Sequence, residues 1–342
     1  MATYVAEDLN DPTLYFETLI WTGDGNTPRT LTGLDFAPNM IWSKRRDDAA
    51  GHNVLDSVRG AGANAELCPS STGGEGSNGA ETYGYLSAFT SDGFTVTAGS
   101  SDNAYWNNNT ATYVAWCWKE SATAGFDIVT YTGNETARTI SHSLSAKPRV
   151  IICKGRSVAS NWTTQHGSYG AEKQFQLQET DAIADHATTW NDAEPTTSVF
   201  SVGTGTACND NGETFVAYLW SEKQGYSKFG GWTGNGNADG PYIYLGFRPA
   251  WIMYKTVDQA DNWEIHNNKT DTFNPMDTIL YANRTNAESD PASTTDRLDI
   301  TANGFKIRTG SSDYNGSGNT YIYMAFAEAP FVNSKGVPFN AR

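Results

Sequence analysis

The chain has 342 residues and a formal net charge of −15, from 38 acidic and 23 basic residues. This balance excludes a basic footprint for nucleic acid and disfavours binding to an anionic membrane surface. The first residues carry no basic segment followed by an apolar one, and no run is long enough to span a bilayer, so we expect a chain that folds in the reducing cytoplasm.

Charged residues make up only 18% of the chain, aromatic residues 13%, and 33 residues are glycine. This composition is typical of short strands joined by polar turns. No segment has a sustained apolar period of 3.6 residues, so helices should be few and brief, and heptads are absent. The four cysteines, Cys68, Cys117, Cys153 and Cys208, show no Cys-x-x-Cys spacing. We therefore expect neither a zinc knuckle nor a disulfide framework, with Cys117 and Cys153 as buried thiols in strands.

After a lead-in of residues 1–18, the sequence repeats itself three times. Each copy opens with an aromatic residue followed by Thr-Gly and Asp or Asn, at Trp21–Asp24, Tyr131–Asn134 and Trp232–Asn235. Fifteen residues beyond each glycine stands a proline, and six residues beyond that a lysine: Pro38 and Lys44, Pro148 and Lys154, Pro249 and Lys255. A residue before proline favours extended geometry, so each proline marks the entry into an apolar strand. We expect the glycine after each Thr to supply a left-handed or bulged position.

Three further positions recur in each copy. Eight residues past each lysine stand His52, Trp162 and Trp263. A second apolar block follows at residues 93–96, 200–202 and 304–307. The copy closes with an aromatic and β-branched run after an Asn/Gly-rich tip, at Thr112–Trp118, Thr214–Trp220 and Thr320–Phe326. We interpret this run as the last, central strand of the repeated unit, buried on both faces.

The fold class that follows is all-β, as three tandem antiparallel β-sandwich domains of jelly-roll style. We place them at residues 1–119 (with the lead-in), 120–223, and 224–342 (with a C-terminal tail from residue 332), and refer to them as repeats 1, 2 and 3. The opening and closing strands of each repeat should be adjacent in one sheet. Residues 60–80 are rich in Gly, Ala, Ser and Asn and predict a long surface loop, and residues 172–185 a strand followed by a helical turn. The linkers at 119–125 and 221–225 are short, so neighbouring domains should pack closely.

No constellation of residues predicts catalysis, a metal or a cofactor. The five histidines lack metal-binding spacing, and both the Gly-x-Ser-x-Gly elbow and the phosphate-binding loop are missing. The carboxylate pairs Asp56 with Glu66 and Asp258 with Asp261 are better interpreted as solvated loop charges than as a glycosidase pair. Oxygen ligands at 209–213 and 313–316 could hold calcium, but Asn-Gly turn chemistry explains them better. Trp162 and Trp263 could stack on a sugar, although their recurrence favours core packing.

Recognition by this chain should lie in its polar, aromatic loops, which composition suggests are exposed and which the repeat does not constrain. The candidate recognition residues are Asn103, Tyr105, Trp106, Asn107, Asp210, Asn211, Asp313, Tyr314 and Asn315.

Several of these segments resemble a recurring module of tailed-bacteriophage virion proteins, most closely from Gly225 to Phe331. The resemblance is carried by residues 225–236, 240–243, 246–251, 303–308, 320–323 and 325–331, and in repeat 1 by residues 38–44 and 56–60. The module has no catalytic residues to transfer.

The resemblance implies a non-enzymatic structural protein on the virion exterior, assembled in the host cytoplasm and in contact with other virion proteins. The favoured role is a tail-fibre or host-attachment component that presents loops to a host glycan or protein. A capsid decoration or cement protein is the alternative, and a polysaccharide depolymerase is less favoured. A homo-oligomer is expected, with a trimer preferred, and neither nucleic-acid binding nor membrane insertion.

Overall fold

The computed structural model describes residues 9, 11–288, 297–328, 331–332 and 338–339. Most of the predicted lead-in up to residue 10 and most of the predicted tail lie outside these residues. The fold is all-β with several antiparallel sheets, which confirms the predicted class. Helices in the described part of the chain are single turns, as expected: η1 (Pro12–Leu14), η2 (Ala63–Ala65), α1 (Ala80–Tyr83), α2 (Ala187–Trp190), α3 (Thr206–Asn209) and α4 (Ser312–Asn315).

Repeat 1 forms a larger and a smaller sheet. The larger has the order β1 (Phe16–Thr22), β7 (Thr112–Trp118), β3 (Met40–Arg45), β4 (Asn53–Asp56). The smaller has the order β2 (Arg29–Thr32), β6 (Gly93–Thr97), β5 (Tyr85–Thr90).

Repeats 2 and 3 follow the same plan. In repeat 2 the larger sheet has the order β13 (Ala184–Asp185), β12 (Lys173–Gln176), β11 (Thr163–His166), β10 (Val150–Gly155), β15 (Thr214–Trp220), β8 (Phe126–Thr132), and the smaller pairs β14 (Val199–Val202) with β9 (Arg138–Ser141). In repeat 3 the larger sheet has the order β16 (Ser227–Thr233), β23 (Thr320–Ala327), β18 (Pro249–Thr256), β19 (Glu264–Asn267), β20 (Leu280–Tyr281). Its smaller sheet has the order β17 (Tyr242–Tyr244), β22 (Gly304–Ile307), β21 (Leu298–Thr301), and a separate hairpin joins β24 (Phe331–Val332) to β25 (Pro338–Phe339).

Each closing strand is central in its sheet, as the sequence predicted. β7, β15 and β23 pair on one side with the opening strand of their own repeat and on the other with the strand that follows the proline. The first aromatic residue of each opening motif stacks on the first aromatic residue of the closing strand. The ring centroids are 5.2 Å apart for Trp21 and Tyr113, 5.4 Å for Tyr131 and Phe215, and 4.8 Å for Trp232 and Tyr321.

The closing strands face two different cores because successive side chains in a strand point to opposite sides of the sheet. In β7, Tyr113, Ala115 and Cys117 face the core between the two sheets of repeat 1. Val114, Trp116 and Trp118 face a second core, which also contains residues of repeats 2 and 3. β15 and β23 divide their side chains in the same way. This explains why all three runs are apolar at consecutive positions.

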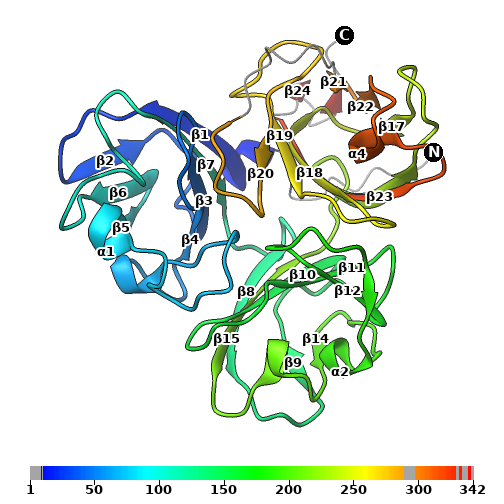
Figure 1. The fold of residues 1–342 in the computed structure, drawn as a ribbon, viewed down its shortest axis with the longest axis horizontal. Helices are drawn as coiled ribbons and strands as arrows, with labels where there is room; N and C mark the ends of the chain where they lie inside the picture. The colour runs from blue at the N-terminus through cyan, green and yellow to red at the C-terminus, as the bar shows by residue number, and fades with distance from the viewer. Residues whose placement is uncertain (1–8, 10, 289–296, 329–330, 333–337, 340–342) are drawn as a thin grey trace.

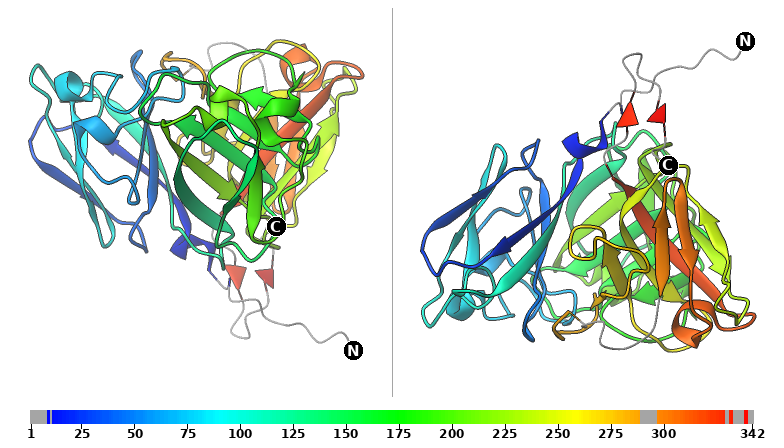
Figure 2. Two further views of the ribbon diagram at one scale, coloured as in Figure 1. Left: turned by 90° about the horizontal axis from the view of Figure 1, so that it is seen from below. Right: turned by 90° about the horizontal axis from the view of Figure 1, so that it is seen from above.

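The three larger sheets pack around this common core, with the smaller sheets on the outside of the molecule (Figure 1). The last aromatic residues of the closing strands meet there, with Trp118 5.6 Å from Phe326 and 6.3 Å from Trp220 between ring centroids. Seen from the side, the three repeats lie at one level, and β24 and β25 project from one end of the body (Figure 2). The repeats therefore pack closely, as their short linkers predicted.

Equivalent hydrogen bonds join the repeats in a closed ring. The backbone N–H six residues after each recurring lysine donates to a threonine carbonyl of the neighbouring repeat. The three pairs are Ala50 with Thr285 (2.9 Å), Ser160 with Thr72 (2.9 Å) and Asp261 with Thr180 (2.7 Å). Repeat 1 thus contacts repeat 3 in the same manner as it contacts repeat 2.

The recurring residues eight positions after each lysine serve the same ring. The indole of Trp162 donates to the Cys68 carbonyl at 2.9 Å, and that of Trp263 to the Gln176 carbonyl at 3.1 Å. Nε2 of His52 lies 2.8 Å from the Tyr281 carbonyl. Both tryptophans are buried, at 1% and 2% exposure, as core packing predicted.

The three recurring lysines are fully buried, and burial is the main cause that lowers the pKa of each to about 8. Lys154 and Lys255 reach across the ring, donating to the Thr72 carbonyl at 3.1 Å and the Thr180 carbonyl at 2.8 Å. Lys44 stays within repeat 1 and donates to the Arg45 carbonyl at 2.6 Å.

One expectation about local structure, a left-handed glycine, is wrong, and another, a surface loop, holds only in part. The glycines after the opening threonines, Gly23, Gly133 and Gly234, are absent from the positive-φ residues. They are required because another backbone approaches closely: a Cβ at these positions would lie 1.9, 2.1 and 2.2 Å from a carbonyl oxygen of the tip before the closing strand. Most of the loop at residues 60–80 is exposed or half-buried, as expected, but Glu66, Leu67 and Cys68 are buried and Thr72 joins the ring.

Candidate functional site

The structure buries five of the nine predicted recognition residues. Trp106, Asn107 and Asn315 are 0% exposed, Tyr314 is 4% exposed and Asn103 is 8% exposed, so the expectation of exposure is wrong for these residues. Tyr105 and Asp210 are half-buried, and only Asn211 and Asp313 are exposed. The two exposed residues lie in different repeats, near the tips that precede β15 and β23.

An asparagine pins each of these tips to the opening motif of the same repeat. Asn107 Nδ2 donates to Asp24 Oδ1 at 2.8 Å and to the Asn26 carbonyl at 2.7 Å, while Asn107 Oδ1 accepts from the Asp24 N–H at 3.1 Å. Asn209 and Asn315 hold the equivalent turns through Asn134 and Asn235. These asparagines satisfy backbone groups of a turn, which explains their burial and their recurrence.

Buried polar side chains converge in repeat 3, where β18, β19 and α4 meet. Tyr254, Glu264, His266 and Tyr314 are each less than 5% exposed. The Tyr254 hydroxyl donates to Glu264 Oε2, and the rings of Tyr254 and His266 stack at 5.8 Å. Carboxylate oxygens of Glu264, Asp261 and Asp313 all lie within 4.8 Å of one another.

This carboxylate group is the part of the described chain that could hold a metal ion, since oxygen ligands of this kind suit Ca²⁺. The negative charge of this carboxylate group is also reduced without a bound ion, because Glu264 is protonated. Burial raises the pKa of Glu264 to about 8, against smaller lowering effects of the Tyr254 and Tyr314 hydroxyls, so Glu264 holds a proton at neutral pH. Burial likewise lowers the pKa of His266 to about 3, which keeps its imidazole neutral. Glu264 and His266 are thus uncharged groups in the core, whereas Asp261 is half-buried and Asp313 is exposed.

Sequence reasoning missed this cluster, although the repeat contained a signal for it. Strand register places Tyr254 and Glu264 opposite each other, as it does Ser43 with Asn53 in repeat 1 and Cys153 with Thr163 in repeat 2. A carboxylate therefore stands where the other repeats have small neutral residues. Aligning the three copies position by position could have identified Glu264 as an unusual strand residue.

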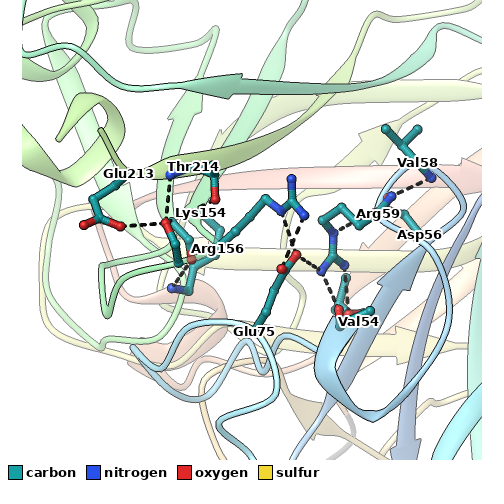
Figure 3. A network of polar contacts seen from close by, with 12 residues as sticks. Val54, Asp56, Val58, Arg59, Glu75, Lys154, Arg156, Glu213 and Thr214 are labelled. Atoms are coloured by element: carbon teal, nitrogen blue, oxygen red, sulfur yellow. Dashed lines mark hydrogen bonds and ion pairs between the residues drawn. The ribbon is translucent and has the colours of Figure 1, made fainter. Parts of the chain in front are cut away.

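A second polar network joins repeat 1 to repeat 2 (Figure 3). Arg59, whose side chain is 0% exposed, pairs with Asp56 at 2.5 Å and with Glu75 at 3.0 Å. The Tyr218 hydroxyl of β15 donates to Asp56 Oδ2 at 2.7 Å and accepts from Arg59 Nη2 at 3.1 Å. Arg156 of repeat 2 completes the network with an ion pair to Glu75 at 2.7 Å.

The positions of Arg156 and Glu75 recur in the other two junctions, and one of these two junctions also has an ion pair there. Between repeats 1 and 3, Arg46 Nε donates to Glu288 Oε2 at 2.7 Å. Between repeats 2 and 3, the same positions hold Val257 and Ile183, joined by a backbone hydrogen bond of 3.1 Å. Two junctions thus use an ion pair where the third uses apolar residues, which indicates that the network serves assembly of the ring.

The interpretation of both carboxylate pairs as solvated loop charges is wrong for Asp56 and Glu66, which are buried, whereas Asp258 is exposed. Asp56 is 0% exposed and occupied by Arg59 and Tyr218, and Glu66 is 1% exposed. Burial raises the pKa of Glu66 to about 7. Asp258 accepts hydrogen bonds from the backbone and hydroxyl of Thr320, so it holds the start of β23, while Asp261 belongs to the cluster around Glu264.

All four cysteines are buried free thiols, in agreement with the expected absence of a disulfide framework. In the described part of the chain, no helix is long and apolar enough to cross a membrane.

Comparison with known proteins identifies one family. The model of the family described as "Domain of unknown function (DUF7483)" matches residues 11–330, a span that includes all three repeats. No curated protein and no solved structure matches the chain.

Proposed function

The chain belongs to the DUF7483 family, a domain of unknown function, and from its own residues we propose that it is a non-enzymatic structural component of a tailed-phage virion. Its role is that of a tail-fibre or host-attachment protein on the virion exterior, in contact with other virion proteins. The resemblance of residues 225–331 to phage virion modules motivates this proposal.

The observation that carries the proposal is the closed ring of repeats. Lys154 and Lys255, the residues eight positions after each recurring lysine, and the ion pairs between Arg and Glu serve contacts between repeats. The buried carboxylates are engaged in the same framework or held neutral by burial. Such a body is rigid, and its outer sheets and loop tips remain for recognition.

We further propose that each repeat is one jelly-roll-like β-sandwich domain, with boundaries at residues 119 and 223. Support comes from the separate core between the two sheets of each repeat and from the adjacency of opening and closing strands. The internal ring of three also favours a threefold partner or a trimeric assembly on the particle.

Immunogold labelling of purified particles tests the function. We expect antibodies against the chain to label particle tails, and excess purified chain to reduce adsorption of particles to host cells. Labelling distributed over the capsid would favour a decoration protein instead. A chain absent from particles, or one that cleaves host polysaccharide on incubation, would contradict the proposal.

A further inference from the structure

The smaller sheet of repeat 3 exposes two aromatic side chains on its outer face. Tyr242 and Tyr244 in β17 are 45% and 58% exposed, while Ile243 between them points into the core. The register places Tyr242 opposite Lys306 and Tyr244 opposite Gly304. Apolar rings that remain in water on a folded surface favour a role in binding.

Repeats 1 and 2 lack these rings at the same positions. In β2 of repeat 1 the matching residues are Thr30, opposite Thr95, and Thr32, opposite Gly93. In β9 of repeat 2 they are Thr139 and Ser141. Small hydroxyl residues therefore suffice for this fold, so the tyrosines are a special property of repeat 3.

Tyr242 lies across the neighbouring strand. Its hydroxyl contacts Asn303 Oδ1 and lies 3.3 Å from Thr301 Oγ1. A Cβ added to Gly304 would lie 3.1 Å from that hydroxyl. The aromatic ring of Tyr242 thus lies over Gly304 of β22, and its hydroxyl is held by Asn303 and Thr301. One face of the aromatic ring remains toward solvent.

Tyr244, two residues further along β17, is held by different contacts. Lys228 Nζ lies 5.3 Å from the centroid of the Tyr244 ring and donates to the Tyr244 carbonyl at 2.7 Å. The Tyr244 hydroxyl lies 3.6 Å from the position of a Cβ on Gly246. Both rings therefore have fixed orientations before any ligand arrives, which reduces the entropy lost on binding.

Each charged group around the two rings is already engaged by neighbouring atoms, and Lys228 Nζ is held by the ring and the carbonyl of Tyr244. Lys306 pairs with Asp239 at 2.7 Å and Arg308 with Asp299 at 2.5 Å. Besides the engaged Lys228, the polar groups beside the rings are the Asn303 amide and the hydroxyls of Thr301 and the tyrosines. This surface suits a neutral ligand with an apolar face and hydroxyl groups at its rim.

We propose that Tyr242 and Tyr244 form a platform that binds neutral pyranose units of a surface polysaccharide. A pyranose ring presents C–H groups on one face and hydroxyls around its edge, which match an aromatic face bordered by amide and hydroxyl groups. A nucleobase would also stack, but the net charge of −15 opposes its phosphates. The inference rests on the proposed attachment function and names the ligand class that repeat 3 takes.

A glycan array with the full chain tests the platform. The test variant is Tyr242→Thr with Tyr244→Thr, which installs residues found at both matching positions of repeat 1. The control variant is Tyr83→Ala, which removes a tyrosine 39% exposed in repeat 1. We expect the wild type and the control to bind neutral glycans, and the double variant to bind more than about tenfold more weakly with an unchanged melting temperature.

The outcomes separate the platform from the attachment function. If the double variant bound glycans as tightly as the wild type, the platform proposal would be overturned, whereas the proposed attachment function would not be affected. Binding restricted to anionic glycans would overturn the neutral ligand class. A wild type that binds no glycan but blocks particle adsorption, with the block lost in the double variant, would make the partner a protein. A wild type that neither binds glycans nor blocks adsorption would overturn both proposals.

Discussion

At the scale of single residues, the residues that recur in the three repeats make close contacts within the fold more often than they form recognition surfaces. Asn107 and Asn315 looked like exposed loop residues because of their composition, yet each fills its hydrogen-bonding capacity inside a turn. Gly133 has a similar role, since it allows the backbone of residues 209 and 210 to pass within contact distance. Composition alone does not separate a polar side chain that binds a ligand from one that completes a turn.

Gly133→Ala should destabilise the fold through a steric clash. The new Cβ would lie 2.1 Å from the Asp210 carbonyl oxygen, whereas Gly212, with φ of +82°, has open space around its Cβ position. We expect a loss of about 3 kcal/mol for Gly133→Ala from overpacking and about 1 kcal/mol for Gly212→Ala from backbone strain. Urea unfolding of both variants measures the difference, and a smaller loss for Gly133→Ala would contradict the steric argument.

Glu264→Gln should change how stability depends on pH. Burial raises the pKa of Glu264 from 4.5 to about 8, so the folded state holds a proton that the unfolded state releases. This contribution to stability is complete below pH 4.5 and is lost as the pH rises through 8. The amide cannot ionise, so the wild type should lose a few kcal/mol relative to the variant between pH 5 and pH 8.

Unfolding free energies at pH 5, 6, 7 and 8 test this expectation. Glu81→Gln, at an exposed position in α1, is the matched control and should run parallel to the wild type. Parallel curves for Glu264→Gln would show that Glu264 is ionised in the folded protein.

At the scale of elements, the junctions between repeats depend on side chains that the repeat had already identified. Trp162 in repeat 2 bonds a carbonyl of repeat 1, and Trp263 bonds one of repeat 2. The sequence showed that these positions recur with the lysines, but spacing alone did not show that they face a neighbouring repeat. The contacts are non-local, and no local propensity encodes them.

Trp162→Phe should cost more than Trp106→Phe. Both indoles are buried, but Trp162 donates to Cys68 at 2.9 Å, whereas no described group accepts from the indole N–H of Trp106. Removing the Trp162 donor removes its hydrogen bonds to the carbonyls of Cys68 and Ser71, so we expect an excess loss of about 1 kcal/mol over Trp106→Phe. Thermal and urea unfolding of the two variants provide the comparison, and equal losses would mean that the junction bond contributes nothing.

At the scale of the whole molecule, the shared core makes the repeats interdependent. Trp118, Trp220 and Phe326 come from three repeats and lie in one hydrophobic cluster. An isolated repeat would expose this face to water.

We expect the full chain to unfold in one cooperative transition. In calorimetry, the measured enthalpy should match the van't Hoff enthalpy. A fragment of residues 120–223 alone should aggregate or bind a hydrophobic dye, because Tyr218 and Trp220 lose their cover. Three separable transitions, or a monomeric and cooperatively folding fragment, would show that the repeats are independent.

Much of this fold could be predicted from the sequence, but little of the candidate sites. The identical spacing of Pro38, Lys44 and their counterparts indicated duplication, and the aromatic runs at Thr112, Thr214 and Thr320 indicated central strands. The ring arrangement could not be read, because both faces of a closing strand are apolar whichever way the repeats pack. The cluster around Glu264 depends on tertiary contacts between β18, β19 and α4, and the tyrosine platform depends on register.

The junction between repeats 1 and 3 is the one that closes the ring of three repeats. The Ala50–Thr285 bond and the Arg46–Glu288 pair join segments that are far apart in the chain, at a junction where no peptide linker connects the two repeats. The three repeats are joined in one polypeptide. Closure of the ring of repeats is therefore an intramolecular step and does not depend on the protein concentration. A trimer of separate one-repeat chains would dissociate on dilution, whereas this body stays whole when a single copy is released into the medium.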